Sequence, residues 1–366
     1  MNKYLSENYG LFGTVPQKQN RLTATMRAVF GNPVLHYVLF GAVMLVVGYL
    51  SANRIIPDLL PYAVQSSLAS TFAYAIAAVG FCLLMGYSGL ASLGIGGFIG
   101  IGCYSVHFIM SEAGLPFAVA VAAAVAVGVV IGLIVGFISL RIEGIYLVIL
   151  TLGLSEILRN LFVAIQDTIR VGNWELFGIE IKRADTIYVV TVLLVIIMII
   201  THNLINSPTG RAMLAMKNST AASQAMGISL LKYRLLAFVI CTVYAVLAGM
   251  MLLLSVRSAI ASNGAGFYAL ITSLNILAAV IIGGYRSIWG AVFGTFVMYG
   301  MQTTLLNRIE YLQQHPEIIT FVSGILVIIV VMFYPGGLAQ LMLEAKTNIK
   351  KLQKKQREAR YGKDLG

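Results

Sequence analysis

Ten apolar stretches, each about as long as a lipid bilayer is thick, constrain what this chain can fold into. A helix needs about 20 mostly apolar residues to cross the hydrocarbon core of a membrane. The stretches cover residues 34–52, 62–85, 90–110, 116–139, 144–165, 186–205, 233–256, 267–283, 288–305 and 317–334. Only 11% of the 366 residues are charged, whereas a soluble domain carries about 25%. We expect an all-α polytopic membrane protein with about ten transmembrane helices, not a soluble enzyme, a disordered chain or a nucleic-acid binder.

The distribution of charge predicts how these spans are oriented. The chain carries 25 Lys and Arg against 14 Asp and Glu. With a cytoplasmic N-terminus, most basic residues lie inside and most acidic residues lie outside, as the positive-inside rule requires. Both termini are then cytoplasmic. We expect a cytoplasmic N-terminal tail over 1–33 without a cleaved signal peptide, a transmembrane domain over 34–340 and a basic cytoplasmic tail over 341–366.

Neither metal nor nucleotide chemistry is predicted for this chain. Cys82, Cys103 and Cys241 each lie inside an apolar run, and none has a CxxC or CxxH spacing. This pattern predicts buried thiols instead of a disulfide framework or a metal site. The sequence contains no G-x-x-x-x-G-K-[ST] phosphate-binding loop, so any ATP hydrolysis belongs to a partner. We therefore expect no catalytic residues and no cofactor.

Small residues form one regular stripe and one dense cluster. Residues 120, 124, 128, 132 and 136 are all Ala or Gly, which predicts a packing seam on one helix face. Seven glycines lie between Gly86 and Gly102, and each glycine weakens a helix by about 1 kcal/mol relative to alanine. A continuous straight helix is therefore not expected there. Two interpretations remain: a broken backbone that lines a solute path with Ser88, Ser92, Gly94 and Gly97, or close helix packing.

Ionisable side chains inside the spans are few. Glu156 and Arg159 lie three residues apart on one helix face, with Thr151 as a looser neighbour. They form either a structural ion pair or a polar wall of the solute path. The four histidines lie near span ends without acidic neighbours at helical spacing: His36, His107, His202 and His315. The chain thus shows no relay that would couple transport to protons.

The longest internal polar segment covers residues 206–232. Pro208 and Gly210 mark its start, a short helix is expected over 211–216, and a second helix is expected from a Ser219 cap to Ala225, ending at Gly227. The two helices are amphipathic and carry no acids. They form either a connector lying on lipid headgroups or a docking surface for a cytosolic protein.

Four motifs in this order resemble a known family. They are GYSGLASLG at 86–94, LRIEGIYLVILTLGLSEI at 140–157, SPTGRA at 207–212 with AASQAMGI at 221–228, and IGGYRSIWG at 282–290. Together they resemble the LivM-type permeases of branched-chain amino acid ABC importers, over about residues 62–337. Glu143 stands where the family usually has a basic residue, and Arg286 where it usually has glycine.

The resemblance implies a type II ABC-importer-like permease in a bacterial inner membrane. Its partners would be two ATP-binding subunits, a second LivH-like permease and an extracytoplasmic solute-binding protein, with lipid around them. The residues implied in coupling to the ATPase are Gly210, Arg211, Ala215, Ala222, Met226 and Gly227. Urea and short-amide permeases share these motifs, so the solute is either a branched-chain amino acid or such an amide. An ion-coupled secondary transporter, a channel and a membrane enzyme are the remaining classes.

Overall fold

The computed structural model describes most of the membrane domain. The described residues are 33–52, 62–139, 144–172, 174–176, 179–183, 185–262 and 266–301, with isolated residues between 318 and 337. The tail over 1–32, the tail over 341–366 and most of the tenth predicted span, 317–334, lie outside the described residues. So does Glu143, one of the two departures from the family pattern.

Six long apolar helices account for most of the predicted spans. They are α2 (Pro33–Ala52), α3 (Tyr62–Leu83), α5 (Phe117–Ser139), α6 (Ile145–Gln166), α7 (Thr186–Asn206) and α10 (Leu230–Val256). Each is long and apolar enough to cross a bilayer. Their bounds agree with the predicted spans to within a few residues.

Three predicted spans are shorter than expected. In the region predicted as 90–110, α4 begins only at Ile95 and ends at Val106, followed by the π-helix η2 (His107–Glu112). The eighth and ninth spans are α11 (Leu270–Gly283) and α12 (Ile288–Thr295), with the π-helix η3 (Phe296–Gly300) after α12. Among the described residues, the prediction of ten full-length spans is therefore only loosely met, since hydropathy does not show where a helix starts inside an apolar run.

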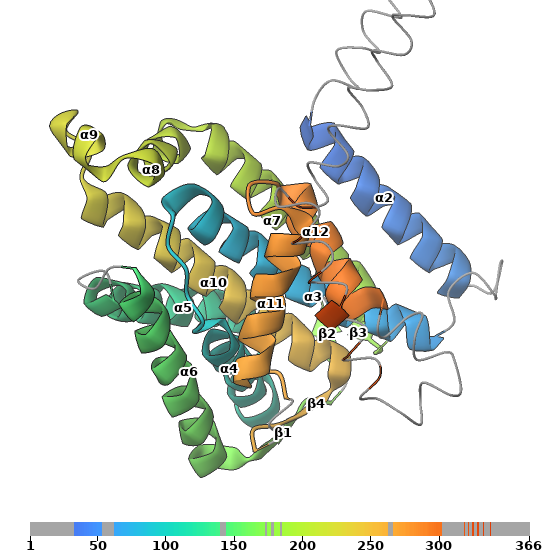
Figure 1. Cartoon of the computed structure of the whole chain (residues 1–366). Helices are drawn as coiled ribbons and strands as arrows, with labels where there is room; N and C mark the ends of the chain where they lie inside the picture. Colours follow the sequence, from blue (N-terminus) through green and yellow to red (C-terminus); the bar gives the residue numbers. More distant parts are fainter. Residues whose placement is uncertain are drawn as a thin grey trace, which may run out of the picture.

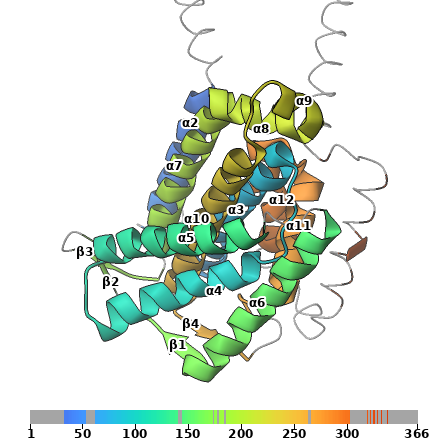
Figure 2. The same cartoon turned by 90° about the vertical axis from the view of Figure 1, so that its left-hand side faces the viewer.

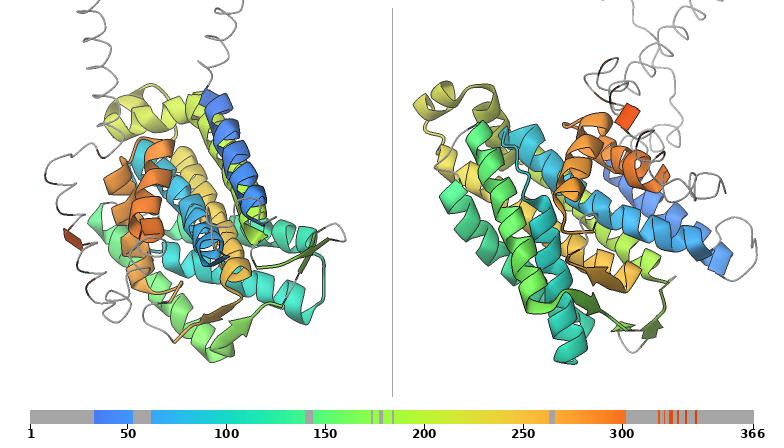
Figure 3. Two further views of the ribbon diagram at one scale, coloured as in Figure 1. Left: turned by 90° about the vertical axis from the view of Figure 1, so that its right-hand side faces the viewer. Right: turned by 60° about the horizontal axis from the view of Figure 1, so that its bottom comes forward.

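Helices α3 and α10 form the centre of the bundle (Figures 1 and 3). Both are mostly buried within the chain, whereas α2, α5 and α6 are mostly exposed. Their exposed side chains are largely Val, Ile, Leu and Phe, which suits contact with lipid or with another membrane subunit. The buried thiols of Cys82, Cys103 and Cys241 are free, as the sequence predicts.

The small-residue stripe of α5 packs against α10. Ala120 and Ala124 are fully buried. A Cβ atom added at Gly128 or Gly132 would lie 3.1 Å from the Cα of Val243 or Val239 on α10. The predicted packing seam is therefore confirmed, and α10 is its partner.

The two ends of the bundle carry different structures (Figure 2). Two short helices, α8 (Pro208–Asn218) and α9 (Thr220–Ala225), lie at one end. Four three-residue strands, which the all-α prediction did not include, lie toward the other end: β1 (Thr168–Arg170), β2 (Trp174–Leu176), β3 (Ile179–Ile181) and β4 (Ser258–Ile260). Strand β1 pairs antiparallel with β4, and β2 with β3.

Candidate functional site

The glycine-rich segment interrupts the helical path between α3 and α4, as predicted. Helix α3 continues into a π-helix, η1 (Leu84–Ser88), and stops at Gly89, whose φ of +74° is left-handed. Leu90 then donates a backbone hydrogen bond to the Leu84 carbonyl at 3.2 Å. Residues 89–94 are not helical, and α4 starts at Ile95. Gly89 is exposed, but Leu90, Ser92, Leu93 and Gly94 of the break are buried inside the protein, where a membrane permits irregular backbone.

Hydroxyl groups from two other helices bind the backbone at the start of α4. The first N–H groups of a helix have no partner within that helix. Here they donate to side chains: Leu93 to Thr151 (3.0 Å) and Gly97 to Ser155 (2.9 Å) on α6, and Gly96 to Ser273 (2.8 Å) on α11. These bonds join the start of α4, and the residues just before it, to α6 and α11.

Glycines further along α4 serve close packing. A Cβ atom at Gly102 would collide with the Val246 carbonyl, and one at Gly249 of α10 would collide with the Ile99 carbonyl. A Cβ atom at Gly100 would collide with the ring of Phe162. The cluster therefore contains both a break at 89–94 and a tight helix crossing at 96–102, and the lining of a solute path by the break stays a prediction.

The predicted path residues cluster around this break. Ser88 is buried and donates to the Leu84 carbonyl at 2.7 Å. Ser92 is buried and accepts from the Gly94 N–H at 3.3 Å. Thr151, also buried, donates to the Val148 carbonyl at 3.1 Å. These hydroxyls hold the backbone in this conformation, and their contact with a solute stays a prediction.

Glu156 lies apart from these hydroxyls, on an uncovered flank of α6. Arg159 donates from Nε to Glu156 Oε1 at 2.9 Å and from a terminal nitrogen to the Ala261 carbonyl at 3.4 Å. The Glu156 side chain is 45% exposed and that of Arg159 is 21% exposed. The exposed Asn160 follows one turn later, and no atom lies within 4 Å of a Cβ placed at Gly153. This flank of α6 thus carries the ion pair and Asn160 beside exposed aliphatic side chains such as Ile149, and it is not covered by the described part of the chain.

The opposite flank of α6 is apolar. Tyr146, Ile157 and Leu161 are all exposed. A helix with one exposed polar flank and one exposed apolar flank is suited to a boundary between lipid and a wet or protein-covered region.

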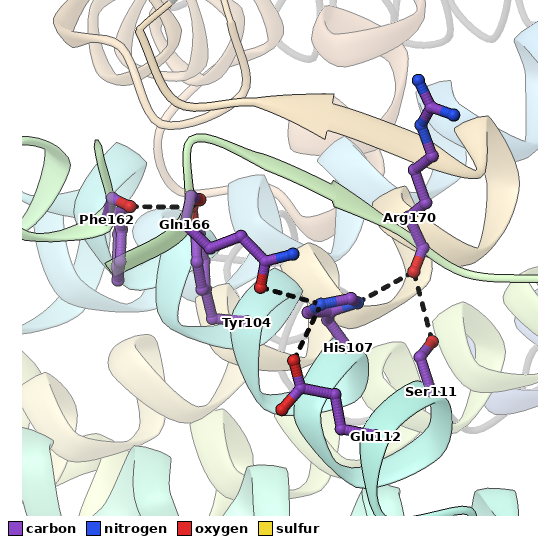
Figure 4. A network of polar contacts seen from close by, with 7 residues as sticks. All are labelled: Tyr104, His107, Ser111, Glu112, Phe162, Gln166 and Arg170. Atoms are coloured by element: carbon purple, nitrogen blue, oxygen red, sulfur yellow. Dashed lines mark hydrogen bonds and ion pairs between the residues drawn. The ribbon is translucent and has the colours of Figure 1, made fainter. Parts of the chain in front are cut away.

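A polar network around His107 was missed by the sequence analysis (Figure 4). The ring nitrogens of His107 lie 2.8 Å from the Arg170 carbonyl oxygen and 3.2 Å from Gln166 Oε1. Glu112 approaches His107 to 3.6 Å, a contact outside the α-helical spacings at which the prediction found no acidic neighbour. The two residues are five apart, which is the spacing of the π-helix η2 that contains both. Ser111 donates to the same Arg170 carbonyl.

This network joins the strand end of the bundle into one unit. Tyr104 of α4 donates to backbone carbonyls of Phe162 and Gln166 on α6. Together with the contacts of His107 and Ser111 to Arg170 of β1, these bonds tie η2, the end of α6 and β1 together.

The two-helix prediction for residues 206–232 is confirmed. Ser207 caps α8 by accepting from the Gly210 N–H at 3.3 Å, and Ser219 caps α9 by accepting from the Ala222 N–H at 3.3 Å. Gly227 has a left-handed φ of +79° just after α9. The buried Met213 and Met216 hold α8 against the bundle.

The predicted coupling residues divide into two groups. Gly210 is buried and packs on the Ile205 carbonyl, and Ala215 is half-buried. The other four are exposed: Arg211, Ala222, Met226 and Gly227. Met226 is 82% exposed. Met226 is an exposed apolar side chain at the tip of a connection between two spans. Such a side chain is suited to binding a partner protein.

Comparison with known proteins identifies the family. The family described as "Branched-chain amino acid transport system / permease component" matches residues 63–331. The chain belongs to this family. It is 28% identical over 299 residues to the high-affinity branched-chain amino acid transport system permease protein LivM of Escherichia coli K12, covering 73% of this chain and 68% of that protein. The LivM protein of Salmonella typhimurium LT2 gives the same identity and coverage. No solved structure matches the chain.

The described part of this permease includes a helix that lies ahead of the matched region. Helix α2 ends at Ala52, before the family match begins, yet it packs on the matched part. Tyr37 is buried, and its ring lies 5.4 Å from that of Trp289 on α12 and 5.7 Å from that of His202 on α7. The first predicted span is thus an integral part of the permease bundle.

Proposed function

We propose that this permease forms half of the translocation pathway of an ATP-driven importer of branched-chain amino acids. The observation that carries the proposal is the exposed α8–α9 pair, which lies between two long spans and presents Met226 at its tip. A transporter without a nucleotide site of its own needs such a surface to bind the ATPase subunit that drives transport. The similarity to the two LivM proteins supports branched-chain amino acids as the solute.

The proposed pathway runs along the break before α4 and the polar flank of α6. Ser88, Ser92, Gly94, Gly97 and Thr151 surround the break, and Glu156 marks the flank. Glycine backbone and small hydroxyls suit a small zwitterionic solute. The partners proposed are two ATP-binding subunits below, a second LivH-like permease against the uncovered flank of α6, and a solute-binding protein at the strand end.

Co-purification and reconstitution test this function directly. The tagged chain is expected to recover an ATPase and a second permease from its native membrane. Proteoliposomes that hold this complex and the binding protein should accumulate leucine only with ATP. Uptake of urea or acetamide in place of leucine would assign the alternative solute class, and uptake by this chain alone would contradict the importer.

The orientation is tested by one new cysteine. In intact cells, a membrane-impermeant maleimide should not label an Asn218→Cys variant, since Asn218 is exposed at the α8–α9 end and we place this end in the cytoplasm. The three native cysteines are buried, so the background is low. Leu115→Cys, exposed near the strand end, is the matched control and should react in intact cells. Labelling at Asn218 with none at Leu115 would reverse the orientation.

Met226→Asp is expected to release the ATPase subunits. A charged side chain at position 226 would not be buried against the partner as methionine is. Recovery of the ATPase with the tagged chain should therefore fall about tenfold or more. Insertion should be unchanged, because Met226 touches little of this chain. Leu115→Asp makes the same chemical change at the other end and should retain the ATPase. Normal recovery with Met226→Asp would show that α9 is not the docking site.

A further inference from the structure

Lys217, in the last turn of α8, reaches from the docking helices to the break in the membrane domain. Its Nζ donates to the carbonyl oxygens of Gly86 at 2.9 Å and Met85 at 3.1 Å. Both carbonyls belong to η1, which ends the helical path of α3. The last carbonyls of a helix lack partners within it and carry partial negative charge, so they attract a cation.

An aromatic ring completes the surroundings of this ammonium group. Nζ lies 4.4 Å from the centre of the Tyr285 ring, within the range of a cation–π contact. Tyr285 belongs to the turn between α11 and α12, and its carbonyl accepts from the Cys82 thiol at 3.3 Å and packs on Gly86. The hydroxyl of Tyr87 donates to the next carbonyl of this turn, that of Arg286, at 3.1 Å. Lys217 thus contacts α3 and the α11–α12 turn where they touch.

The stem of Lys217 covers the residue at which the helix breaks. A Cβ atom at Gly89 would lie 3.2 Å from Lys217 Cγ. Gly89 also has a left-handed φ. Glycine at this position therefore both permits the break and leaves room for the lysine stem. A shift of α8 along its axis would therefore first displace residues 85–89.

Lys217 is partly withdrawn from water. Burial, and to a smaller extent the positive charge of Arg286, lower the pKa of Lys217 from its usual value. A desolvated ammonium is costly unless its hydrogen bonds are made, so the contacts to Met85 and Gly86 are expected to persist as α8 moves. By contrast Lys232, at the start of α10, is exposed.

We propose that Lys217 is the positioning residue that transmits movement of the α8–α9 pair to the break before α4. The contact joins the proposed motor-facing surface to η1, and η1 is followed directly by the segment whose N–H groups are bound by α6 and α11. The proposal rests on the proposed importer function, because it presupposes a motor at α8–α9.

Lys217→Met tests this transmission in the reconstituted complex, because methionine keeps most of the stem and removes the ammonium. Leucine uptake is expected to fall about tenfold or more, the loss typical of one charge-assisted hydrogen bond, while ATP hydrolysis stays within about twofold of wild type. Lys217→Arg should restore most of the uptake, since the guanidinium can donate to the same carbonyls. Lys232→Met, with the same loss of charge on an exposed residue, should transport normally.

Hydrogen exchange provides a readout that does not depend on transport. In nanodiscs, the amides of residues 84–93 should exchange about tenfold faster in Lys217→Met than in wild type, while those of α10 should not change. If Lys217→Met does not accumulate, Tyr285→Leu, which removes only the aromatic face, should lower uptake in the same direction but less.

Two results would overturn the proposal: uptake within about twofold of wild type in the variants that accumulate, or uptake and ATP hydrolysis falling in equal proportion. The second would make Lys217 part of the docking surface alone. Failure of the proposed function itself is distinguishable, because wild-type complexes would then not take up leucine.

Discussion

Gly102→Ala and Gly249→Ala are each expected to reduce the amount of inserted, monodisperse protein at least fivefold. Added Cβ atoms at these positions would collide with the carbonyls of Val246 and Ile99, so α4 and α10 would have to separate. Overpacking of this kind costs about 3 kcal/mol, which exceeds the gain of about 1 kcal/mol in helix propensity. A loss of that size lowers the steady-state abundance of a protein several-fold. Size-exclusion profiles of the fluorescently tagged chain measure the effect.

Gly153→Ala is the matched control for this prediction. Gly153 is also helical, but nothing lies within 4 Å of an added Cβ. Its replacement should therefore leave the yield unchanged or raise it. Equal yields for all three variants would show that α4 and α10 do not cross as closely as the structure indicates.

The two short helices between α7 and α10 were predictable because their ends depend on local chemistry. Ser219 and Gly227 determine where α9 begins and ends, as predicted, and each acts within a few residues of its own position. Helix α8 begins at Pro208 after the Ser207 cap, three residues earlier than the predicted start at 211. Lys217 was not singled out, because its partners at Met85 and Gly86 are more than a hundred residues away in sequence.

The break before α4 was predictable in kind but not in extent. Seven glycines indicated that a continuous helix would not form, yet composition does not reveal that α4 begins at Ile95 or that Ser155 and Ser273 bind its first N–H groups. The contact between His107 and Glu112 was missed for a related reason. It depends on a π-helix, and the sequence analysis tested only the spacing of an α-helix.

Glu156→Gln is expected to lower leucine uptake about tenfold or more in the reconstituted complex. The carboxylate is 45% exposed on a flank of α6 that the described part of the chain leaves uncovered, and we place this flank along the pathway. Since the ion pair with Arg159 is partly exposed, its own contribution to stability is about 1 kcal/mol or less. Yield should therefore change less than uptake. Glu175→Gln, at an exposed carboxylate of β2, should leave uptake unchanged.

The double variant Glu156→Gln/Arg159→Gln separates a pathway role from a structural one. If the pair is only structural, Glu156→Gln leaves the Arg159 guanidinium without its carboxylate partner and with only the Ala261 carbonyl as an acceptor in the described part of the chain, so the yield falls. The double variant, which has no unpaired charge, would then regain both yield and uptake. If the carboxylate lines the pathway, leucine uptake by the double variant stays as low as that of Glu156→Gln, because the carboxylate that faces the solute is still missing. Normal uptake in the double variant would therefore remove Glu156 from the pathway and leave the hydroxyls around the break as its polar lining.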